Sequence, residues 1–475
     1  MVAILYCLSK ERIQQKKMNN IPVEKNKEYI VDIIDNGFEG EGIAKIDNFT
    51  IFIPNSIKGE KCRILIVKVL SSRAYGKIVE IIQESKNRID VDCSTYKRCG
   101  GCDLRHMTYE STLEIKKNTV QSLINKGVKS DVIVQNTIGM EKPYNYRNKA
   151  QYPVGLDKNG NPAIGVFAKM SHTIIPIEKC FIQTEISQKI ANTIMDFVKK
   201  NNIEVYNEEK QTGLLRHIII KVGMQTHEVM CILVLNKEQF KQEKQLVDLL
   251  ISKYSDIKAI VKNINTKNTN VILGQKNIDL YGSGYIEDKL GEYTFKISPM
   301  SFYQINPVQA EVLYNTAIKL ANLNKEDILF DLYCGIGTIG IFASKYVKRV
   351  YGIEIVPQAI EDAKENAKIN NIQNAEFIVG DVEFAFDELI NKKHIIPTAI
   401  IVDPPRRGLD EKTIGNILYA KPEKLVYISC NPATMVRDLA MLEKVYDIKL
   451  IQPVDMFPWT KHVECVAVLN LKKNI

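Results

Sequence analysis

The chain has 475 residues, which is too long for one small domain and predicts two or three. Hydrophobic residues make up 45% of the chain and charged residues 25%, a balance typical of a globular protein whose core needs no disulfide framework. The formal net charge of +8 suits a polyanionic partner, although solubility alone accounts for such a charge in many proteins.

Two classes of protein are excluded at this level. The ten cysteines do not indicate a secreted, disulfide-bonded protein, because the chain is long and no secretory signal opens it. No run of about 18 apolar residues occurs, so a membrane span is excluded. We therefore expect a cytoplasmic protein whose reduced cysteines are available to bind metal or to react. The sequence implies no protein partner, and we expect a monomer.

The N-terminal part is predicted to be a tail followed by a barrel. Residues 1–22 are expected to be a disordered tail, in which Met18 is an alternative start. Residues 23–84 are expected to form an OB-like β-barrel, because short strand-like runs alternate with turn signals. Basic residues gather in and around its third run: Lys61, Arg63, Lys68, Arg73 and Lys77. They form either a solvated edge or a grip on nucleic acid, which small basic barrels commonly provide.

A central α+β domain is expected over residues 85–290. It begins with a cysteine-rich, loop-like segment at residues 90–105 and a predicted helix at residues 108–126. Apolar runs at residues 215–222 and 229–235 predict strands.

The last domain is expected over residues 291–475. Strand-like runs alternate there with helical stretches, which predicts a doubly wound parallel sheet of Rossmann-like type with helices on both faces. The predicted strands are Ile328–Leu332, Val350–Glu354, Ala375–Val379, Thr398–Asp403 and Lys424–Ser429.

A glycine-rich loop follows the first of these strands, with three glycines between residues 335 and 340 that lead into a helix. Glu354 ends the next strand, where a carboxylate can accept hydrogen bonds from ribose hydroxyls. The loop matches the dinucleotide-binding motif G-x-G-x-x-G, so a nicotinamide-dependent enzyme is one possibility. Asp331 before the loop and Asp403-Pro404-Pro405 at the end of the fourth strand instead favour an S-adenosylmethionine-dependent methyltransferase.

The residue after this acidic motif bears on which atom is methylated. Enzymes that methylate exocyclic amines often place an aromatic residue there to stack on the base, whereas this chain has Arg406. That difference argues against amine methylation and leaves carbon methylation open.

Cys430 follows the fifth strand, at the same edge of the sheet as the predicted cofactor. A packing cysteine is the ordinary alternative. Carbon 5 of uracil, however, is a poor nucleophile until a thiolate adds to carbon 6, so a thiol at this edge has a chemical purpose. A base must then remove the proton from carbon 5. His462 and Glu464 are both candidates, and Glu464 is favoured because it opens a final strand-like run; a solvated Glu at a strand start is the alternative.

A second set of cysteines has the spacing of metal ligands. Cys93, Cys99 and Cys102 lie within ten residues, and Cys180 follows later. Four thiolates can hold either a zinc ion or an iron–sulfur cluster, and the spacing alone does not decide between them; free structural cysteines are the third possibility.

Taken together, these motifs resemble the RNA uracil-5-methyltransferase family, in its bacterial 23S ribosomal RNA branch, from about residue 23 to the end. The nucleophile motif S-C-N-P-A-T matches at residues 429–434, and the base motif D-M-F-P-x-T-x-H-x-E matches at residues 455–464. The motif F-x-Q-x-N matches at residues 302–306, and Gly40-Glu-Gly-Ile-Ala-Lys45 is similar to a segment of the family's TRAM barrel.

The resemblance implies an activity, two cofactors and a set of site residues. The activity is methylation of carbon 5 of a uridine in 23S ribosomal RNA, with Cys430 as nucleophile and Glu464 as general base. S-adenosylmethionine would contact six residues: Gln304, Tyr333, Thr338, Glu354, Asp381 and Asp403. A four-iron, four-sulfur cluster would be held by Cys93, Cys99, Cys102 and Cys180.

Three alternatives remain open. A transfer RNA uracil-5-methyltransferase would use the same chemistry, although related tRNA enzymes usually lack both the barrel and the cluster. A non-catalytic RNA-binding protein would need only the barrel, and a nicotinamide oxidoreductase has only the glycine loop in its favour.

Overall fold

The computed structural model describes residues 21–473, apart from residues 158 and 170. The predicted disordered tail lies outside the described residues except for its last two. The chain divides into two compact units. The first comprises the described part of residues 1–92 with Cys102–Thr119 and Trp459–Lys461, and the second comprises Cys93–Gly101, Val120–Pro458 and the remainder of the C-terminal segment.

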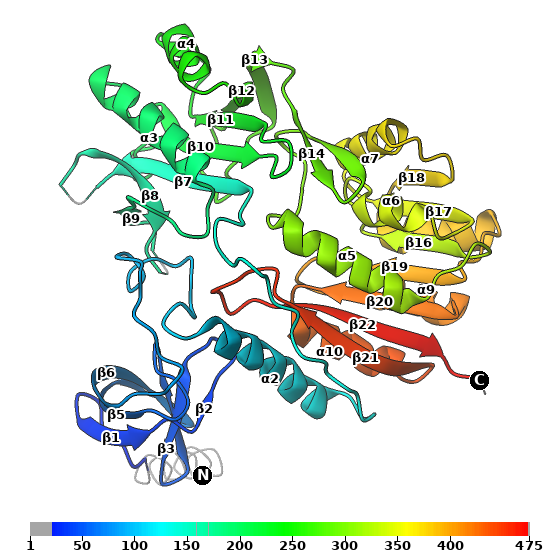
Figure 1. Cartoon of the computed structure of the whole chain (residues 1–475), viewed down its shortest axis with the longest axis horizontal. Coiled ribbons are helices and arrows are strands. Elements are labelled where there is room, and N and C mark those ends of the chain that lie inside the picture. The colour runs from blue at the N-terminus through cyan, green and yellow to red at the C-terminus, as the bar shows by residue number, and fades with distance from the viewer. Residues whose placement is uncertain (1–20, 158, 170, 474–475) are drawn as a thin grey trace, which may run out of the picture. The chain divides into compact units, whose positions relative to one another are not determined.

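The first unit contains a six-stranded sheet that closes on itself in the order β1-β5-β6-β4-β3-β2 (Figure 1). Its strands are β1 (Glu28–Asp32), β2 (Asp35–Asn36), β3 (Gly42–Ile46), β4 (Phe49–Ile53), β5 (Lys61–Val69) and β6 (Arg73–Gln83). Cys62, Ile64 and Ile66 alternate inward along β5, while Lys61 and Arg63 face solvent, because successive side chains of a strand point to opposite faces. The strand-rich N-terminal region predicted from the sequence is confirmed.

The second unit includes the C-terminal part of α2 (Tyr109–Gly127) and a seven-stranded sheet of order β13-β12-β11-β10-β7-β8-β9. The bounds are β7 (Lys149–Leu156), β8 (Pro162–Phe167), β9 (Ile174–Pro176), β10 (Leu215–Val222), β11 (Val229–Leu235), β12 (Ile257–Ile264) and β13 (Lys276–Gly282). Helices α3 (Glu185–Lys200) and α4 (Glu243–Lys253) cover one face. Ile218 and Ile220 point toward that helical layer, while Ile219 points into a core shared with the next sheet.

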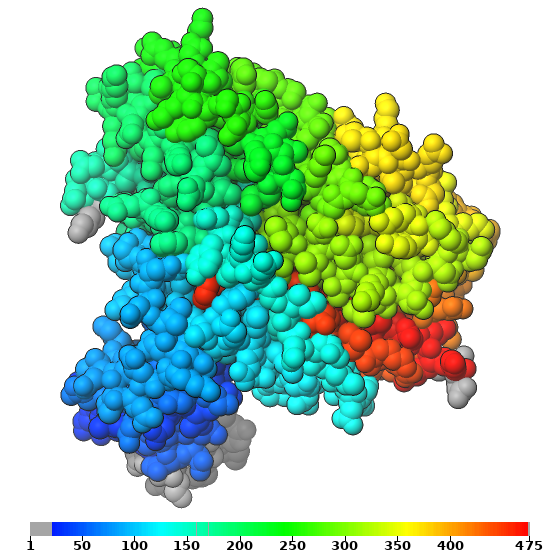
Figure 2. All heavy atoms as spheres, in the orientation of Figure 1, coloured from blue at the N-terminus to red at the C-terminus, as the bar shows by residue number. Residues whose placement is uncertain are grey.

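A hairpin of β14 (Ile286–Leu290) and β15 (Tyr293–Ile297) leads to the C-terminal sheet, whose order is β18-β17-β16-β19-β20-β22-β21. Its strands are β16 (Ile328–Leu332), β17 (Arg349–Glu354), β18 (Ala375–Val379), β19 (Ala399–Val402), β20 (Lys424–Ser429), β21 (Tyr446–Val454) and β22 (Glu464–Leu471). Figure 2 shows one face of this unit, on which the atoms of the central region (green) border those of the C-terminal region (yellow to red).

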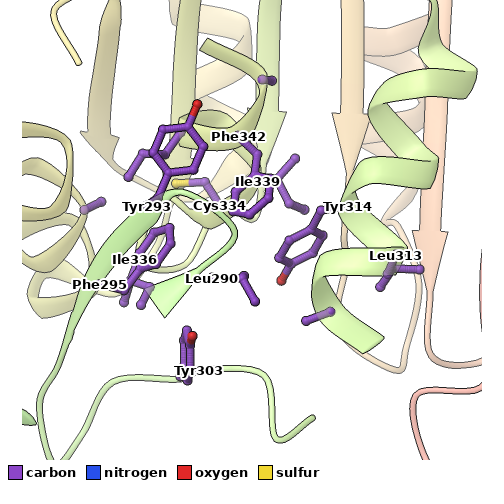
Figure 3. Packing of buried hydrophobic residues seen from close by; sticks show 14 of the residues in the cluster. Leu290, Tyr293, Phe295, Tyr303, Leu313, Tyr314, Cys334, Ile336, Ile339 and Phe342 are labelled. Carbon is purple, nitrogen blue, oxygen red and sulfur yellow. The ribbon is translucent and has the colours of Figure 1, made fainter. Parts of the chain in front are cut away.

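Helices lie on both faces of the C-terminal sheet, as the sequence predicts. On one face are α5 (Pro307–Ala321), α6 (Thr338–Ser344) and α7 (Pro357–Ile369); on the other are α8 (Val382–Asp387), a π-helical turn (Glu388–Lys392), α9 (Glu411–Ala420) and α10 (Pro432–Leu442). Figure 3 shows the first core, where the Phe342 ring lies between those of Tyr293 and Tyr314, with centroids 5.1 and 5.8 Å away. The Rossmann-like fold is confirmed.

One feature of the sheet differs from the prediction. Strands β16 to β20 are parallel, but β22 runs antiparallel to both β20 and β21. Only residues 455–463 join β21 to β22, and so short a connection can join only antiparallel neighbours, because a parallel crossover needs about a dozen residues or more. Among the described residues, no helix is both long and apolar enough to cross a membrane.

Candidate active site

The loop after β16 is shaped by residues with positive φ. Tyr333, Gly335 and Gly337 have φ of 66°, 54° and 80°. A Cβ on Gly337 would lie 2.8 Å from the ring of Phe377, so only glycine fits there, whereas a Cβ on Gly335 would meet open space. Asp331 closes the turn by accepting a 2.8 Å hydrogen bond from the amide of Gly340. The open side of the loop is thereby left free for a ligand to approach the backbone.

A cavity of about 610 Å³ opens beside this loop, at the carboxyl ends of β16, β17 and β19. This is the point where the strand order reverses, and ligands of open α/β sheets bind there. The cavity is lined by all six residues predicted to contact a cofactor: Gln304, Tyr333, Thr338, Glu354, Asp381 and Asp403. Cys430 and Glu464 line the same cavity. The structure thus brings together every residue that the sequence assigned to catalysis or to the cofactor.

Several of these side chains are held by hydrogen bonds. Glu354 accepts hydrogen bonds from the amides of Gly335 and Val356, at 3.3 and 3.0 Å. Asp381 caps α8 by accepting from the amide of Glu383 at 3.0 Å. These bonds use the loop and helix amides to fix the carboxylates at the cavity wall.

The topology explains why Cys430 and Glu464 meet. Ser429, the last residue of β20, pairs with Cys465 on the antiparallel strand β22. Cys430 leaves the sheet at the end where Glu464 enters it, so two residues 34 positions apart in the sequence lie side by side. The other candidate base, His462, does not line the cavity; its ring lies edge-on to Phe457, with centroids 6.1 Å apart.

Burial and charge act together on the ionisable groups here. Burial raises the pKa of Glu464 well above its ordinary range, the Asp403 carboxylate raises it further, and the Arg406 guanidinium lowers it. Burial also raises the pKa of Asp403 to about 7. For Cys430 burial raises the pKa of the thiol to about 11, with Glu464 and Asp403 adding to the effect and Arg406 opposing it. Arg406 is thus the charge that favours the ionised form of both reacting groups.

The segment that carries Glu464 is fixed from α5. The side chain of Asn306 is fully buried; its amide oxygen caps α5, and its Nδ2 donates to the carbonyl of Met456 at 3.0 Å. Gln309, one turn later, donates through Nε2 to the carbonyl of Asp455 at 3.1 Å. Asn306 belongs to the motif F-x-Q-x-N, so that motif also holds the loop before β22 in place.

The segment that carries Gln304 is fixed from the central sheet. Lys221 of β10 donates through Nζ to the carbonyls of Ser298 and Ser301, at 2.8 and 3.0 Å. Ser301 in turn donates to Asp362 of α7 at 2.6 Å. Burial lowers the pKa of Lys221 to about 7, with Lys149 lowering it further and Asp362 opposing both. One buried amine therefore joins the central sheet to the wall of the cavity.

Comparisons with known proteins agree with this geometry. A family model described as tRNA (Uracil-5-)-methyltransferase matches residues 108–473, and one described as TRAM domain matches residues 22–79. The chain belongs to the tRNA (uracil-5-)-methyltransferase family. It is therefore an RNA methyltransferase of the uracil-5 class, and the family resemblance drawn from the motifs is confirmed.

Individual relatives extend over nearly the whole chain. An uncharacterized RNA methyltransferase of Clostridium acetobutylicum is 48% identical over 454 residues, covering 95% of this chain and 98% of its own. One of Halalkalibacterium halodurans is 43% identical over 453 residues, with the same coverage. The crystal structure of Pyrococcus abyssi tRNA (uracil-54, C5)-methyltransferase in complex with S-adenosyl-L-homocysteine is 28% identical, with a TM-score of 0.74, and covers 93% of this chain and all of that chain.

Four residues that line the cavity were not predicted from the sequence to contact the cofactor. Phe302, Tyr314 and Phe457 add aromatic walls, and Arg406 adds a cation. Phe302 and Phe457 belong to quoted motifs and Arg406 follows Asp403-Pro-Pro directly, so motif membership could have indicated three of these four. Tyr314 lies within α5 and carries no signal of its own.

The predicted metal ligands are divided between the two units. In the second unit, Cys99 is close enough to Cys180 and Cys93 for their thiols to raise its pKa, an effect smaller than that of burial. The amide of Gly101 donates to the Cys99 sulfur at 3.2 Å. Cys102 belongs to the first unit. Within the part of the chain that the structure describes, no group of three or more His, Cys, Asp or Glu side chains is arranged to hold a metal ion.

Proposed function

We propose that the chain methylates carbon 5 of a specific uridine in 23S ribosomal RNA, with S-adenosylmethionine as methyl donor and Cys430 as covalent nucleophile. The observation that carries this proposal is the pairing of Ser429 with Cys465, which sets Cys430 beside Glu464 in the cavity of the cofactor residues. The family supplies the class of reaction, and this arrangement supplies a nucleophile and a base for it.

The cavity fits the proposed methyl donor on its own chemistry. Glu354 ends β17 at a place where its carboxylate can accept bonds from ribose hydroxyls, and Gly335 leaves the loop backbone open to a ligand. S-adenosylmethionine, when bound, would supply an electrophilic methyl group and would leave as S-adenosylhomocysteine, which keeps the electron pair of the broken methyl–sulfur bond. The positive charge of this methyl donor would favour the ionised form of the Asp403 carboxyl, whose pKa is raised to about 7 by burial.

The chain's own residues account for the remaining steps. The thiolate of Cys430 adds to carbon 6 of the uracil; the carbon 5–carbon 6 double bond opens, and its electrons make carbon 5 enolate-like. Carbon 5 then takes the methyl group. The Glu464 carboxylate removes the proton left on carbon 5, the double bond re-forms, and the Cys430 thiolate leaves. Since both groups must act ionised, Arg406 assists each step by lowering both pKa values.

The RNA would reach this cavity with its target base turned out of the stack, because carbon 5 and carbon 6 are otherwise covered by neighbouring bases. The N-terminal barrel would hold the surrounding RNA by phosphate contacts and stacking. Arg73 donates to the hydroxyl of Tyr75 at 3.2 Å, and the Tyr75 ring lies 5.8 Å from that of Phe52, so one strand pair offers both a cation and two rings.

The choice of 23S ribosomal RNA rests on the TRAM barrel and the four cysteines, which match the ribosomal branch. Transfer RNA is the second candidate, favoured by the name of the family and by the similarity to the Pyrococcus abyssi tRNA (uracil-54, C5)-methyltransferase structure. Nucleoside mass spectrometry of separated ribosomal RNA and tRNA from a deletion strain decides between them. Loss of one 5-methyluridine from 23S RNA is expected; loss from tRNA alone would move the assignment, and unchanged levels in both would end the proposal.

We also propose that Cys93, Cys99, Cys102 and Cys180 hold a four-iron, four-sulfur cluster. Four thiols supply the donors that such a cluster needs, and the Gly101 amide that donates to Cys99 is the kind of bond that stabilises cluster sulfur. No catalytic step is assigned to the cluster. Anaerobically purified protein should be brown and contain about four irons per chain; colourless protein containing zinc would refute this assignment.

A further inference from the structure

A second cavity, of about 670 Å³, lies on the central sheet and shares no lining residue with the catalytic cavity. Its volume is within the range of small-ligand sites. The walls come from β7, the hairpin of β8 and β9, residues 206–209, the start of β10 and residues 269–272. These segments all belong to the second unit.

A β-bulge shapes one wall. Leu215 of β10 pairs with Leu235 of β11, but the next paired residue is His217, opposite Val234, so Arg216 is an extra residue. Neighbouring residues of a regular strand point to opposite faces, whereas a bulge re-aims a side chain. As a result, Arg216 and His217 both line the cavity.

The wall made by Arg216 is rigid. Its guanidinium lies 4.3 Å from the centroid of the Tyr206 ring, and its Nη1 donates to the carbonyls of Asn265 and Lys267 at 2.6 and 2.9 Å. Within the described residues, the buried Nε of Arg216 and Nδ1 of His217 have no hydrogen-bond partner. The side of the cavity that Arg216 forms is therefore fixed in place.

The opposite wall is flat and aromatic. The rings of Phe167 and His172 stack with centroids 5.0 Å apart and planes inclined by 20°. His172 also bonds through Nδ1 to the carboxylate of Glu208, at 2.8 Å to Oε2. Phe167 is 36% exposed, so its ring is available to a ligand. A ring platform thus stands next to a carboxylate.

The charge of the cavity selects what enters it. Among the described residues that line it, three carry carboxylates, Asp157, Glu208 and Glu209, and one, Arg216, carries a permanent positive charge. Burial lowers the pKa of His217 to about 4, so this ring is neutral near pH 7. A net negative wall repels phosphate but accepts hydrogen bonds from a neutral ring that carries N–H groups.

We propose that this cavity binds a second, unmethylated nucleobase of the RNA, one with an exocyclic amino group, stacked on Phe167 and His172 with the amino group donating to Glu208. Adenine, cytosine and guanine carry such an amino group, and uracil does not. The inference rests on the proposed function, since it takes RNA as the ligand. It adds a reading position to the enzyme, so that the choice of uridine depends on a neighbouring base as well as on the target.

The experiment uses short RNA probes, so that it does not require the natural target to be known. Fluorescence anisotropy measures binding of single-stranded A8, C8 and U8 octamers to the full-length protein. A8 and C8 should bind more tightly than U8. An octamer with one 2-aminopurine should lose fluorescence on binding, because stacking on an aromatic ring quenches this base.

Phe167→Ala should weaken A8 binding by about tenfold and remove most of the quenching, since base–aromatic stacking contributes affinity of that order. Glu208→Gln keeps the shape of the side chain and should narrow the preference for A8 over U8. The control is Tyr281→Ala, which removes a similarly exposed ring of the central sheet outside the cavity and should bind like wild type. Thermal unfolding confirms that each variant is folded.

The inference is overturned if folded Phe167→Ala binds and quenches as wild type does, or if Glu208→Gln leaves the A8 preference unchanged. Its failure is distinct from failure of the proposed function. Octamer binding is measured without methyl transfer, so an absence of methyl transfer by wild type would sink the methylation proposal while the octamer result still tested the cavity.

Discussion

Ser429 and Cys465 lie directly opposite each other on the antiparallel strands β20 and β22, and their pairing sets the thiol of Cys430 beside the carboxylate of Glu464. Neither side chain is positioned by its own neighbours in the sequence. The pairing of β20 with β22 brings the two side chains together.

Replacing the nucleophile should abolish covalent chemistry without removing the cofactor site. Wild type incubated with S-adenosylmethionine and substrate RNA containing 5-fluorouridine should form a stable adduct, because carbon 5 then carries no removable proton. Cys430→Ala should form none on a denaturing gel, while its affinity for S-adenosylmethionine by calorimetry stays within about twofold. Cys231→Ala, which alters a buried thiol of the central sheet, should still form the adduct. An adduct with Cys430→Ala would assign the nucleophile elsewhere.

Replacing the base should trap the reaction late. Glu464→Gln keeps the shape of the side chain but cannot take the proton from carbon 5, so covalent protein–RNA complex should accumulate with ordinary uridine RNA. Release of 5-methyluridine should slow by about 10²- to 10⁴-fold, the range of a general base. Quenched-flow sampling with gel analysis measures both species. If Glu464→Gln neither accumulates adduct nor slows product release, another group is the base, and His462→Gln becomes the variant to compare.

The charge of Arg406 should set the pH at which the enzyme works. Arg406 lowers the pKa of both Cys430 and Glu464, and both groups act ionised, so kcat/KM should rise with pH. Arg406→Gln removes the charge, raises both pKa values and should move the rising limb to higher pH. Arg406→Lys keeps the charge and should leave the limb nearer to that of wild type. An equal loss at every pH would show instead that Arg406 contributes only to binding.

Lys221 should link pH to both stability and cofactor affinity. Its pKa is lowered to about 7 in the folded protein and is near 10.4 in an unfolded chain, so between these values the unfolded state binds more protons and stability rises with pH. The free energy of unfolding of wild type relative to Lys221→Met should therefore grow from pH 7 to pH 9, by at most about 1.4 kcal/mol per pH unit. Urea denaturation at each pH measures it.

The same substitution removes the donor to Ser298 and Ser301, so the segment carrying Gln304 should loosen. We expect the Kd of S-adenosylmethionine to rise about tenfold in Lys221→Met, since each unpaired buried carbonyl costs about 1–3 kcal/mol in the folded state. Lys258→Met, which alters an exposed amine of strand β12, serves as control. The role of Lys221 would be contradicted if the free energies of unfolding of wild type and Lys221→Met changed with pH in parallel and the Kd of S-adenosylmethionine stayed the same.

The local pattern of apolar and turn residues was sufficient to predict many strands of the fold. The runs at residues 328–332, 375–379 and 424–429 became β16, β18 and β20 with the same bounds, because an apolar run ended by a turn residue has little choice of conformation. The direction of β22 was not foreseeable in the same way. It depends on the length of the connection from β21, a strand that the sequence analysis did not identify.

Some residues of the site could be predicted from the sequence and others could not. Cys430, Asp403 and Glu354 follow strands, so the rule that ligands bind at the carboxyl ends of strands placed them correctly in one cavity. Lys221 was missed because a single lysine in an apolar strand ordinarily indicates a solvated edge, and only the tertiary structure brings the carbonyls of Ser298 and Ser301 to it. Arg406 was noted for not being aromatic, and its effect on two pKa values appears only once β20 and β22 are paired.

Asn306 has a consequence for how such a chain can evolve. The Asn306 side chain caps α5 with its oxygen and donates to the Met456 carbonyl with its nitrogen. Two motifs about 150 residues apart are therefore structurally coupled. A mutation at Asn306 releases the loop that presents the base, and a mutation that reshapes that loop leaves Asn306 buried without its acceptor. Descendants of this enzyme would therefore inherit the two motifs as a pair, and a change in one would persist only with a compensating change in the other.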